Sequence, residues 1–272
     1  MAPVRTLIVI TGLVAAALPL LAQSQAPPST GPLGPVNALG QEVPRPPVYT
    51  GPAPRLPDGT IDLNGLWVGT PNDLAQTYRT QVGGELPMLP SARAIVDARK
   101  KKEAEDPYLW CLPQGVPRST PYPFRFVPNY THKAPTHLFL LYEGNIHTYR
   151  QIFMDGRTHP AELDPTWFGH SIGRWQKDTL VIDTVGFNDR FWFDRQGTPH
   201  TEQLHIIERW ERPDLGRLVN TVTLEDPGTF SRPVTVTFTA RLAAPGDELM
   251  EYICQENNQF GAAAGIANPF NK

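Results

Sequence analysis

The clearest pattern in the chain is an alternation of apolar and polar residues near its C-terminal end. Val234, Val236, Phe238 and Ala240 alternate with threonines and with Arg241. A period of two is typical of a strand that buries one face. Similar segments recur through the second half of the chain. The strands predicted in this way span 136–142, 146–153, 172–176, 179–185, 203–210, 218–225, 234–241 and 249–254.

Short turn sequences separate these segments, including Glu143-Gly144-Asn145 and Lys177-Asp178. An earlier strand is predicted at Ile61–Val68, directly after Asp58-Gly59. Strands in hairpin succession predict an all-β fold, an antiparallel meander closed into a barrel. A sandwich of two sheets is the alternative, because short turns serve both architectures.

One segment has the pattern of a helix. It runs from Ser91 to Glu105, with Ser91 in position to cap it and Asp106-Pro107 in position to end it. The Pro- and aromatic-rich stretch that follows, up to Pro128, is expected to wrap over the barrel surface.

The N-terminal region differs in composition from the rest. Residues 1–26 read as a secretory signal peptide, in which Arg5 precedes the apolar run Leu7–Leu21 and Ser24-Gln25-Ala26 offers small residues for cleavage. The run is shorter than the roughly 20 residues of a membrane span. We therefore predict an exported protein, periplasmic or secreted, with no membrane span in its mature form.

Ten of the 30 prolines lie between residues 27 and 57, which indicates a stiff extended lead-in. One β-barrel domain is then predicted over 58–260, followed by a C-terminal tail at 261–272. The charge is nearly balanced, with 24 basic and 27 acidic residues, so neither nucleic acid nor an acidic membrane surface is indicated as a partner.

The chain has two cysteines, Cys111 and Cys254. In an exported chain they most simply form one disulfide. A cysteine nucleophile or a pair of metal-binding thiolates is the alternative, and the absence of other cysteines nearby disfavours it.

The connection between residues 153 and 175 is the richest in reactive side chains. Long polar loops on a rigid sheet are where binding and catalytic residues concentrate. Two acid–base pairs are possible there, His170 with Asp164 and His159 with Asp155, since a carboxylate can hold a histidine tautomer and raise its basicity.

Other side chains near this loop could contact a ligand. Trp167 and Phe168 could exclude water and stack on an apolar molecule, and Arg157 or Arg150 could hold an oxyanion. The structural alternative is that Asp155-Gly156 and Asp164-Pro165 simply form turns while Trp167 plugs one barrel end.

Two sharper motifs occur in the sequence. Gly169-His170-Ser171-Ile172-Gly173 matches the G-x-S-x-G elbow of α/β-hydrolases, but no buried strand precedes it and no helix follows it. The histidines and nearby carboxylates have no zinc-protease spacing. We predict neither a metal site nor a cofactor from these residues, which are His159, Glu162, Asp164, His170, His200, Glu202 and His205.

Two resemblances bear on the fold. Gly65-Leu66-Trp67 resembles the G-x-W of the first strand of lipocalins, where the Trp closes one barrel end, and so implies a lipocalin/calycin-like barrel. The run from Gly173 to Thr184, GRWQKDTLVIDT, with Asp155–His159 before it, is similar to a block found in exported bacterial proteins of unassigned function. That resemblance extends to the ending Cys254-Gln255-Glu256-Asn257-Asn258 and implies export but no activity.

The sequence therefore predicts an exported barrel that binds a small, partly apolar organic molecule at a mouth lined by the 153–175 loop. The first alternative is an enzyme, a lyase, isomerase or hydrolase, that uses a His–carboxylate pair in the same mouth. The second is a structural or partner-binding envelope protein.

Overall fold

The computed structural model describes residues 48–70, 73–100, 105–131, 134–144, 148–256 and 258. The predicted signal peptide, residues 27–47 of the Pro-rich segment and the tail at 261–272 lie outside this part of the chain.

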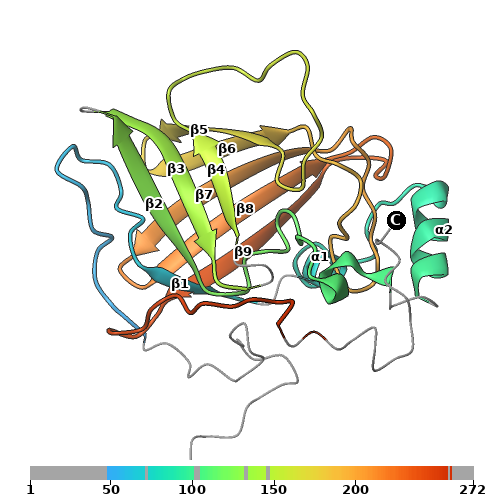
Figure 1. Ribbon diagram of the computed structural model, residues 1–272, viewed down its shortest axis with the longest axis horizontal. Coiled ribbons are helices and arrows are strands. Elements are labelled where there is room, and N and C mark those ends of the chain that lie inside the picture. Colours follow the sequence, from blue (N-terminus) through green and yellow to red (C-terminus); the bar gives the residue numbers. More distant parts are fainter. Residues whose placement is uncertain are drawn as a thin grey trace, which may run out of the picture. The chain divides into compact units, whose positions relative to one another are not determined.

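Nine strands form a closed barrel in which each strand pairs with the next and β9 pairs with β1 (Figure 1). The closure confirms the predicted barrel and excludes the sandwich, while the relation to lipocalins stays a prediction. The strands are β1 (Leu66–Gly69), β2 (Phe124–Thr131), β3 (Ala134–Tyr142), β4 (Tyr149–Phe153), β5 (His170–Gln176), β6 (Thr179–Val185), β7 (His205–Asp214), β8 (Arg217–Glu225) and β9 (Val234–Leu242).

One step around the barrel is not antiparallel. β4 and β5 are parallel and pair only at Ile152–Ser171 and Phe153–Ile172. A parallel step requires the chain to return to the end of the barrel where β4 began. Residues 154–169 make this return, and Figure 1 shows the loop projecting beyond β4 and β5. The predicted all-antiparallel meander was therefore wrong at this one step.

Two predicted strands need correction, and one strand was missed. The first strand begins at Leu66 instead of Ile61, and residues 249–254 are not a strand. The segment around Pro128, expected to wrap over the surface, is instead β2. β2 pairs with β1 only at Phe124 and Arg125, so Pro128 has no partner on that side and is tolerated as on an edge strand.

The helix prediction was partly right. The predicted 91–105 helix is α2 (Pro90–Arg99), whose N-cap is Leu89 and not Ser91, and Pro90 occupies the first turn, where its missing N–H costs nothing. A second helix, α1 (Leu74–Gln81), was missed. Its N-cap Asp73 accepts a hydrogen bond from the Gln76 N–H.

Side chains fill the barrel interior. One apolar cluster includes Ile206 and Val222, and a second includes Trp210 and Leu218. Inward-facing residues between these positions on β7 and β8 are polar, namely Glu208 and Asn220. A buried polar layer thus separates the two apolar clusters.

Arg150 is at the centre of this polar layer. Its guanidinium forms an ion pair with Glu208, Nη1 to Oε2 at 2.5 Å, and both side chains are 1% exposed. Arg150 also donates from Nε to Ser171 Oγ at 3.0 Å and from Nη2 to Thr184 Oγ1 at 2.7 Å. Burial raises the pKa of Tyr142, a neighbour of this pair, so its phenol stays protonated.

Trp67 of the G-x-W is fully buried and belongs to the second apolar cluster. Its Nε1 donates to the Leu63 carbonyl at 3.0 Å. The Arg212 guanidinium lies 4.7 Å from the centroid of the Trp67 ring and donates to the carbonyls of Asp62 and Asn64. Trp67 and Arg212 therefore anchor the segment that precedes β1.

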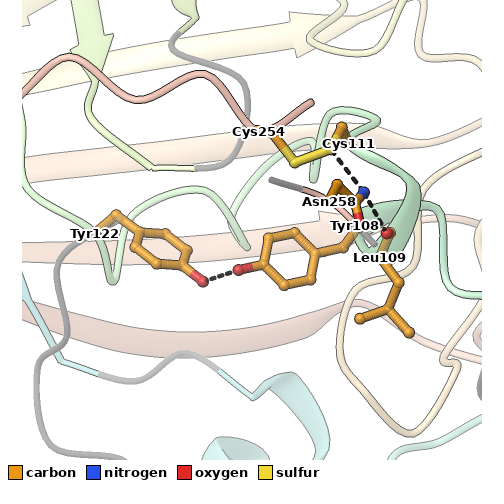
Figure 2. The surroundings of a disulfide bond; sticks show 6 residues. All are labelled: Tyr108, Leu109, Cys111, Tyr122, Cys254 and Asn258. Carbon is orange, nitrogen blue, oxygen red and sulfur yellow. Dashed lines mark hydrogen bonds between the residues drawn. A yellow bond between two sulfur atoms is a disulfide. The ribbon is translucent and has the colours of Figure 1, made fainter. Parts of the chain in front are cut away.

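The predicted disulfide between Cys111 and Cys254 is confirmed, with Cα atoms 5.6 Å apart and a sequence separation of 143 (Figure 2). Cys111 follows the short helix η2 (Pro107–Trp110), and Cys254 lies in a turn. Asn258 donates to the Leu109 carbonyl at 3.0 Å and lies 3.0 Å from Cys111 Sγ. The disulfide thus holds the irregular C-terminal segment against η2.

A buried histidine predicts acid sensitivity. His200 is 4% exposed, its ring centroid lies 3.8 Å from that of Phe191, and burial lowers its pKa to about 4. The imidazole of His200 takes up a proton near pH 6.5 in the unfolded chain but not in the native protein. The contribution of His200 to the free energy of unfolding is therefore complete above pH 6.5 and is lost as the pH drops toward 4. The loss expected over this window is about 3 kcal/mol.

Urea unfolding at pH 7.0 and 4.5 should show the loss in the wild type and a clearly smaller loss in His200→Leu. The matched control is His137→Leu, which removes a histidine on β3. Equal pH dependence of the wild type and the His200→Leu variant would contradict the assignment to His200.

Candidate functional site

The candidate site begins with the gap between β4 and the chain that leads into β5. Thr166 pairs with the continuation of β6, because its N–H donates to Gly186 O at 3.0 Å and its carbonyl accepts from Asn188 N–H at 2.8 Å. This segment therefore follows β6 and leaves the edge of β4 that faces β5 uncovered at Tyr149–Gln151, where β4 pairs with β3 alone. Gly169 then makes the turn into β5 at φ +64°, where a Cβ would lie 2.6 Å from Val185 O.

The gap forms an open groove with a volume of about 490 Å³. This size is within the range of about 300–1,000 Å³ found for small-molecule sites. It lies on the flank of the barrel and not inside the barrel mouth that the sequence suggested. The groove is lined by Thr148, Tyr149, Arg150, Gln151, Phe153, Leu163, Asp164, Thr166, Phe168, Gly169 and His170.

Aromatic rings extend along the outer wall of the groove. Phe153 stacks on His170 with ring centroids 4.9 Å apart, and Tyr149 meets Phe139 edge to face at 5.9 Å. On the inner side, Phe168 stacks on Tyr142 at 5.9 Å and closes the gap toward the barrel interior. The groove thus has aromatic faces on two sides.

A chain of histidines and carboxylates runs outward from His170. His170 Nδ1 lies 2.8 Å from His159 Nδ1, and His159 Nε2 lies 3.2 Å from Asp183 Oδ1. The same Asp183 oxygen lies 2.8 Å from His205 Nε2, and His205 Nδ1 lies 3.1 Å from Glu225 Oε2. Strands β5 to β8 each contribute one of these side chains, and the 154–169 loop contributes His159.

When His159 and His170 are both neutral, the chain defines their tautomers. A carboxylate only accepts, so His159 then carries its proton on Nε2 and its Nδ1 accepts from His170 Nδ1–H. His170 is then left with a lone pair on Nε2. Partial burial, with smaller contributions from His159 and Arg157, lowers the pKa of His170, which favours the neutral imidazole at pH 7. A neutral imidazole at the groove wall has the properties of a general base.

The structure brings four of the predicted site residues to the groove, namely Arg150, Asp164, Phe168 and His170. His159 is part of the chain behind His170. The expected acid–base partners differ, since His170 pairs with His159, and His159 pairs with Asp183 instead of Asp155.

The other predicted residues lie outside the groove wall. Asp155 is paired with Arg157 at 2.5 Å, which lowers the pKa of this exposed carboxyl to about 2. The Arg157 guanidinium covers the Phe153 ring at 3.9 Å. Trp167 packs against the apolar cluster that contains Ile206. Ser171, the serine of the G-x-S-x-G, is fully buried and bound by Arg150, unlike an exposed nucleophile.

Sequence reasoning missed Tyr149, Gln151 and Phe153 in the groove and Asp183 and Glu225 in the chain, and it considered His205 without linking it to His159. The outward direction of Tyr149, Gln151 and Phe153 could be read from strand alternation, since the inward-facing Arg150 and Ile152 lie between them on β4. Their proximity could not be read, because it depends on the register between strands.

Within the described ranges, no group of three or more His, Cys, Asp or Glu side chains is arranged to hold a metal ion. In the same residues, no helix is long and apolar enough to cross a membrane. Comparison with protein-family models, curated proteins and solved structures gives no match to this chain.

Proposed function

We propose that this protein binds a small, partly apolar organic molecule in the groove between β4 and residues 163–170. The observation that carries the proposal is the groove itself, which combines a volume of about 490 Å³ with aromatic rings and a few polar side chains. Gln151, Asp164 and Thr166 supply the polar groups.

The filled barrel interior also supports a site on the flank. The two apolar clusters and the Arg150–Glu208 layer occupy most of the space that a ligand would take in a hollow barrel, and the cavity lined by Phe126, Leu138 and Trp175 has a volume of only about 90 Å³. Because Glu208 compensates the charge of Arg150, the groove floor has no net positive charge from this pair. A neutral ligand with an aromatic or aliphatic ring therefore fits the groove better than an anion.

The proposal predicts separate effects for neighbouring aromatic residues. With 2-phenylethanol as a neutral probe, Tyr149→Ala should weaken binding severalfold and leave the melting temperature nearly unchanged, because Tyr149 is 58% exposed. Trp167→Ala is the matched control. It should lower the stability by about 2 kcal/mol and leave the affinity of the folded protein unchanged, since Trp167 packs on the core.

Titration of amide chemical shifts would measure the affinity, and mass spectrometry of the purified native protein would identify retained molecules. Binding of the probe that is unaffected by Tyr149→Ala and weakened by Trp167→Ala would contradict the assignment to the groove.

A second candidate function is acid–base catalysis in the same groove. The chain Asp183–His159–His170 favours it, because His170 lines the groove and, when both rings are neutral, has a lone pair on Nε2. The reaction classes that need such a base include those of lyases, isomerases and hydrolases. His170→Ala would then abolish turnover of a retained molecule and preserve its binding, whereas a binding protein would show no turnover in either form.

A further inference from the structure

We propose that the ligand of the groove contains peptide-like amides and pairs with the exposed edge of β4, as an added strand pairs with a sheet. This inference rests on the proposed function and specifies its ligand class as a short extended peptide with aromatic side chains.

The direction of the backbone groups along β4 is the first step. Tyr142 N–H donates to Thr148 O and Met154 N–H donates to Thr136 O, both at 2.9 Å. In an antiparallel pair, the N–H and C=O groups of successive residues point alternately toward one neighbouring strand and toward the other. The backbone groups of Thr148, Arg150 and Ile152 therefore point toward β3. Those of Tyr149 and Gln151 point the other way, toward β5.

The second step is that none of the described segments pairs with Tyr149 or with the N–H of Gln151 on that side. The register pairs β4 with β5 at Ile152 and Phe153 alone. Beyond these pairs, the segment before β5 bonds to Gly186 and Asn188 next to β6. The N–H and C=O of Tyr149 and the N–H of Gln151 therefore point into the groove. A strand edge with unpaired backbone groups is a template for another extended chain.

The third step is the arrangement of side chains above this edge. Tyr149, Gln151 and Phe153 all point outward because they alternate with the buried Arg150 and Ile152. An added strand places every second side chain on the same outer face, where the rings of Tyr149 and Phe153 can pack against it. Aromatic side chains in the peptide fit these positions best.

The length of the edge limits the ligand. Three residues of a strand extend over about 10 Å. The groove therefore suits a peptide of three or four residues and not a long segment. A small ring compound would use the aromatic walls of the same groove without using the backbone edge.

The experiment compares three probes. They are acetyl-Phe-Ala-Phe-amide, the same peptide with a methyl group on the backbone nitrogen of each of its three residues, and 2-phenylethanol. Affinities are measured by amide chemical-shift titration of the full-length protein. The tripeptide should bind more tightly than 2-phenylethanol, and N-methylation should weaken its binding at least tenfold, because it removes the donors that reach the Tyr149 carbonyl.

The protein side is tested with Gln151→Pro, which removes an N–H that faces the groove and leaves the bonds to β3 in place. Its matched control is Gln151→Ala, which removes the side chain and keeps the N–H. The Pro variant should bind the tripeptide at least tenfold more weakly than the Ala variant. If the Pro variant does not fold, the N-methylated peptide decides the question with wild-type protein.

Equal affinity for the parent and N-methylated peptides would overturn the inference. Binding of 2-phenylethanol in the groove without binding of the tripeptide would also overturn it and would leave the proposed function standing. Binding of none of the three probes would count against both.

Discussion

Loss of the Cys111–Cys254 disulfide is expected to lower the free energy of unfolding by about 5 kcal/mol. The bond closes a loop across 143 residues, and the expected loss follows from the chain entropy that the unfolded state regains when so large a loop is opened. Urea unfolding of the oxidised wild type and of the Cys111→Ala/Cys254→Ala double variant would measure the difference.

A thiol titration of the unfolded, unreduced protein is the accompanying control and should find no reactive cysteine. The native fold of the variant can be checked by circular dichroism, because neither cysteine lies in one of the nine strands. A loss below about 1 kcal/mol would show that the unfolded chain is not restrained by this bond as the entropy argument requires.

Glu208→Gln is expected to destabilise the protein by about 3–5 kcal/mol, because it leaves the Arg150 charge buried without its counter-charge. The substitution preserves the shape of the side chain, so the effect measures charge compensation rather than a cavity. Equilibrium unfolding in urea at pH 7 would give the value.

The double variant Arg150→Met/Glu208→Leu is the informative comparison. Replacing both members of a buried ion pair by apolar residues often restores stability, so the double variant should be more stable than Glu208→Gln. The Oγ1 atom of Thr184 lies 3.1 Å from Ser171 Oγ, so these hydroxyl groups can still form a hydrogen bond with each other after Arg150 is removed. A double variant less stable than Glu208→Gln would mean that Arg150 stabilises the barrel mainly through the hydroxyl groups.

Much of the strand content could be predicted because strand alternation is local. β6 matches its predicted bounds, and β8 and β9 match theirs within one residue, since their apolar positions repeat every second residue. β2 was missed because Pro128 argues against a strand when its neighbours are unknown. Only the short β1 beside it shows that Pro128 lies at an open edge.

The loop between 153 and 175, which the density of His, Asp and aromatic residues singled out, contributes one wall of the groove. That the groove is a functional site stays a prediction, and the geometry of its side chains was not predicted. The partners of His159 and His170 were wrong because sequence proximity favoured Asp155 and Asp164. The actual partner of His159 is Asp183, which lies 24 residues further along the chain, on β6.

The sequence by itself determined which residues face inward in strands such as β6, β8 and β9, where the turns between them fall and that two cysteines were available for one disulfide. These properties depend on neighbours a few residues apart. The tertiary structure alone decided the closure of the barrel, the parallel step from β4 to β5 and the groove that this step leaves open. The physical reason is that pairing and register depend on which distant segments bury their apolar faces together, and the alternation pattern is the same for every possible partner.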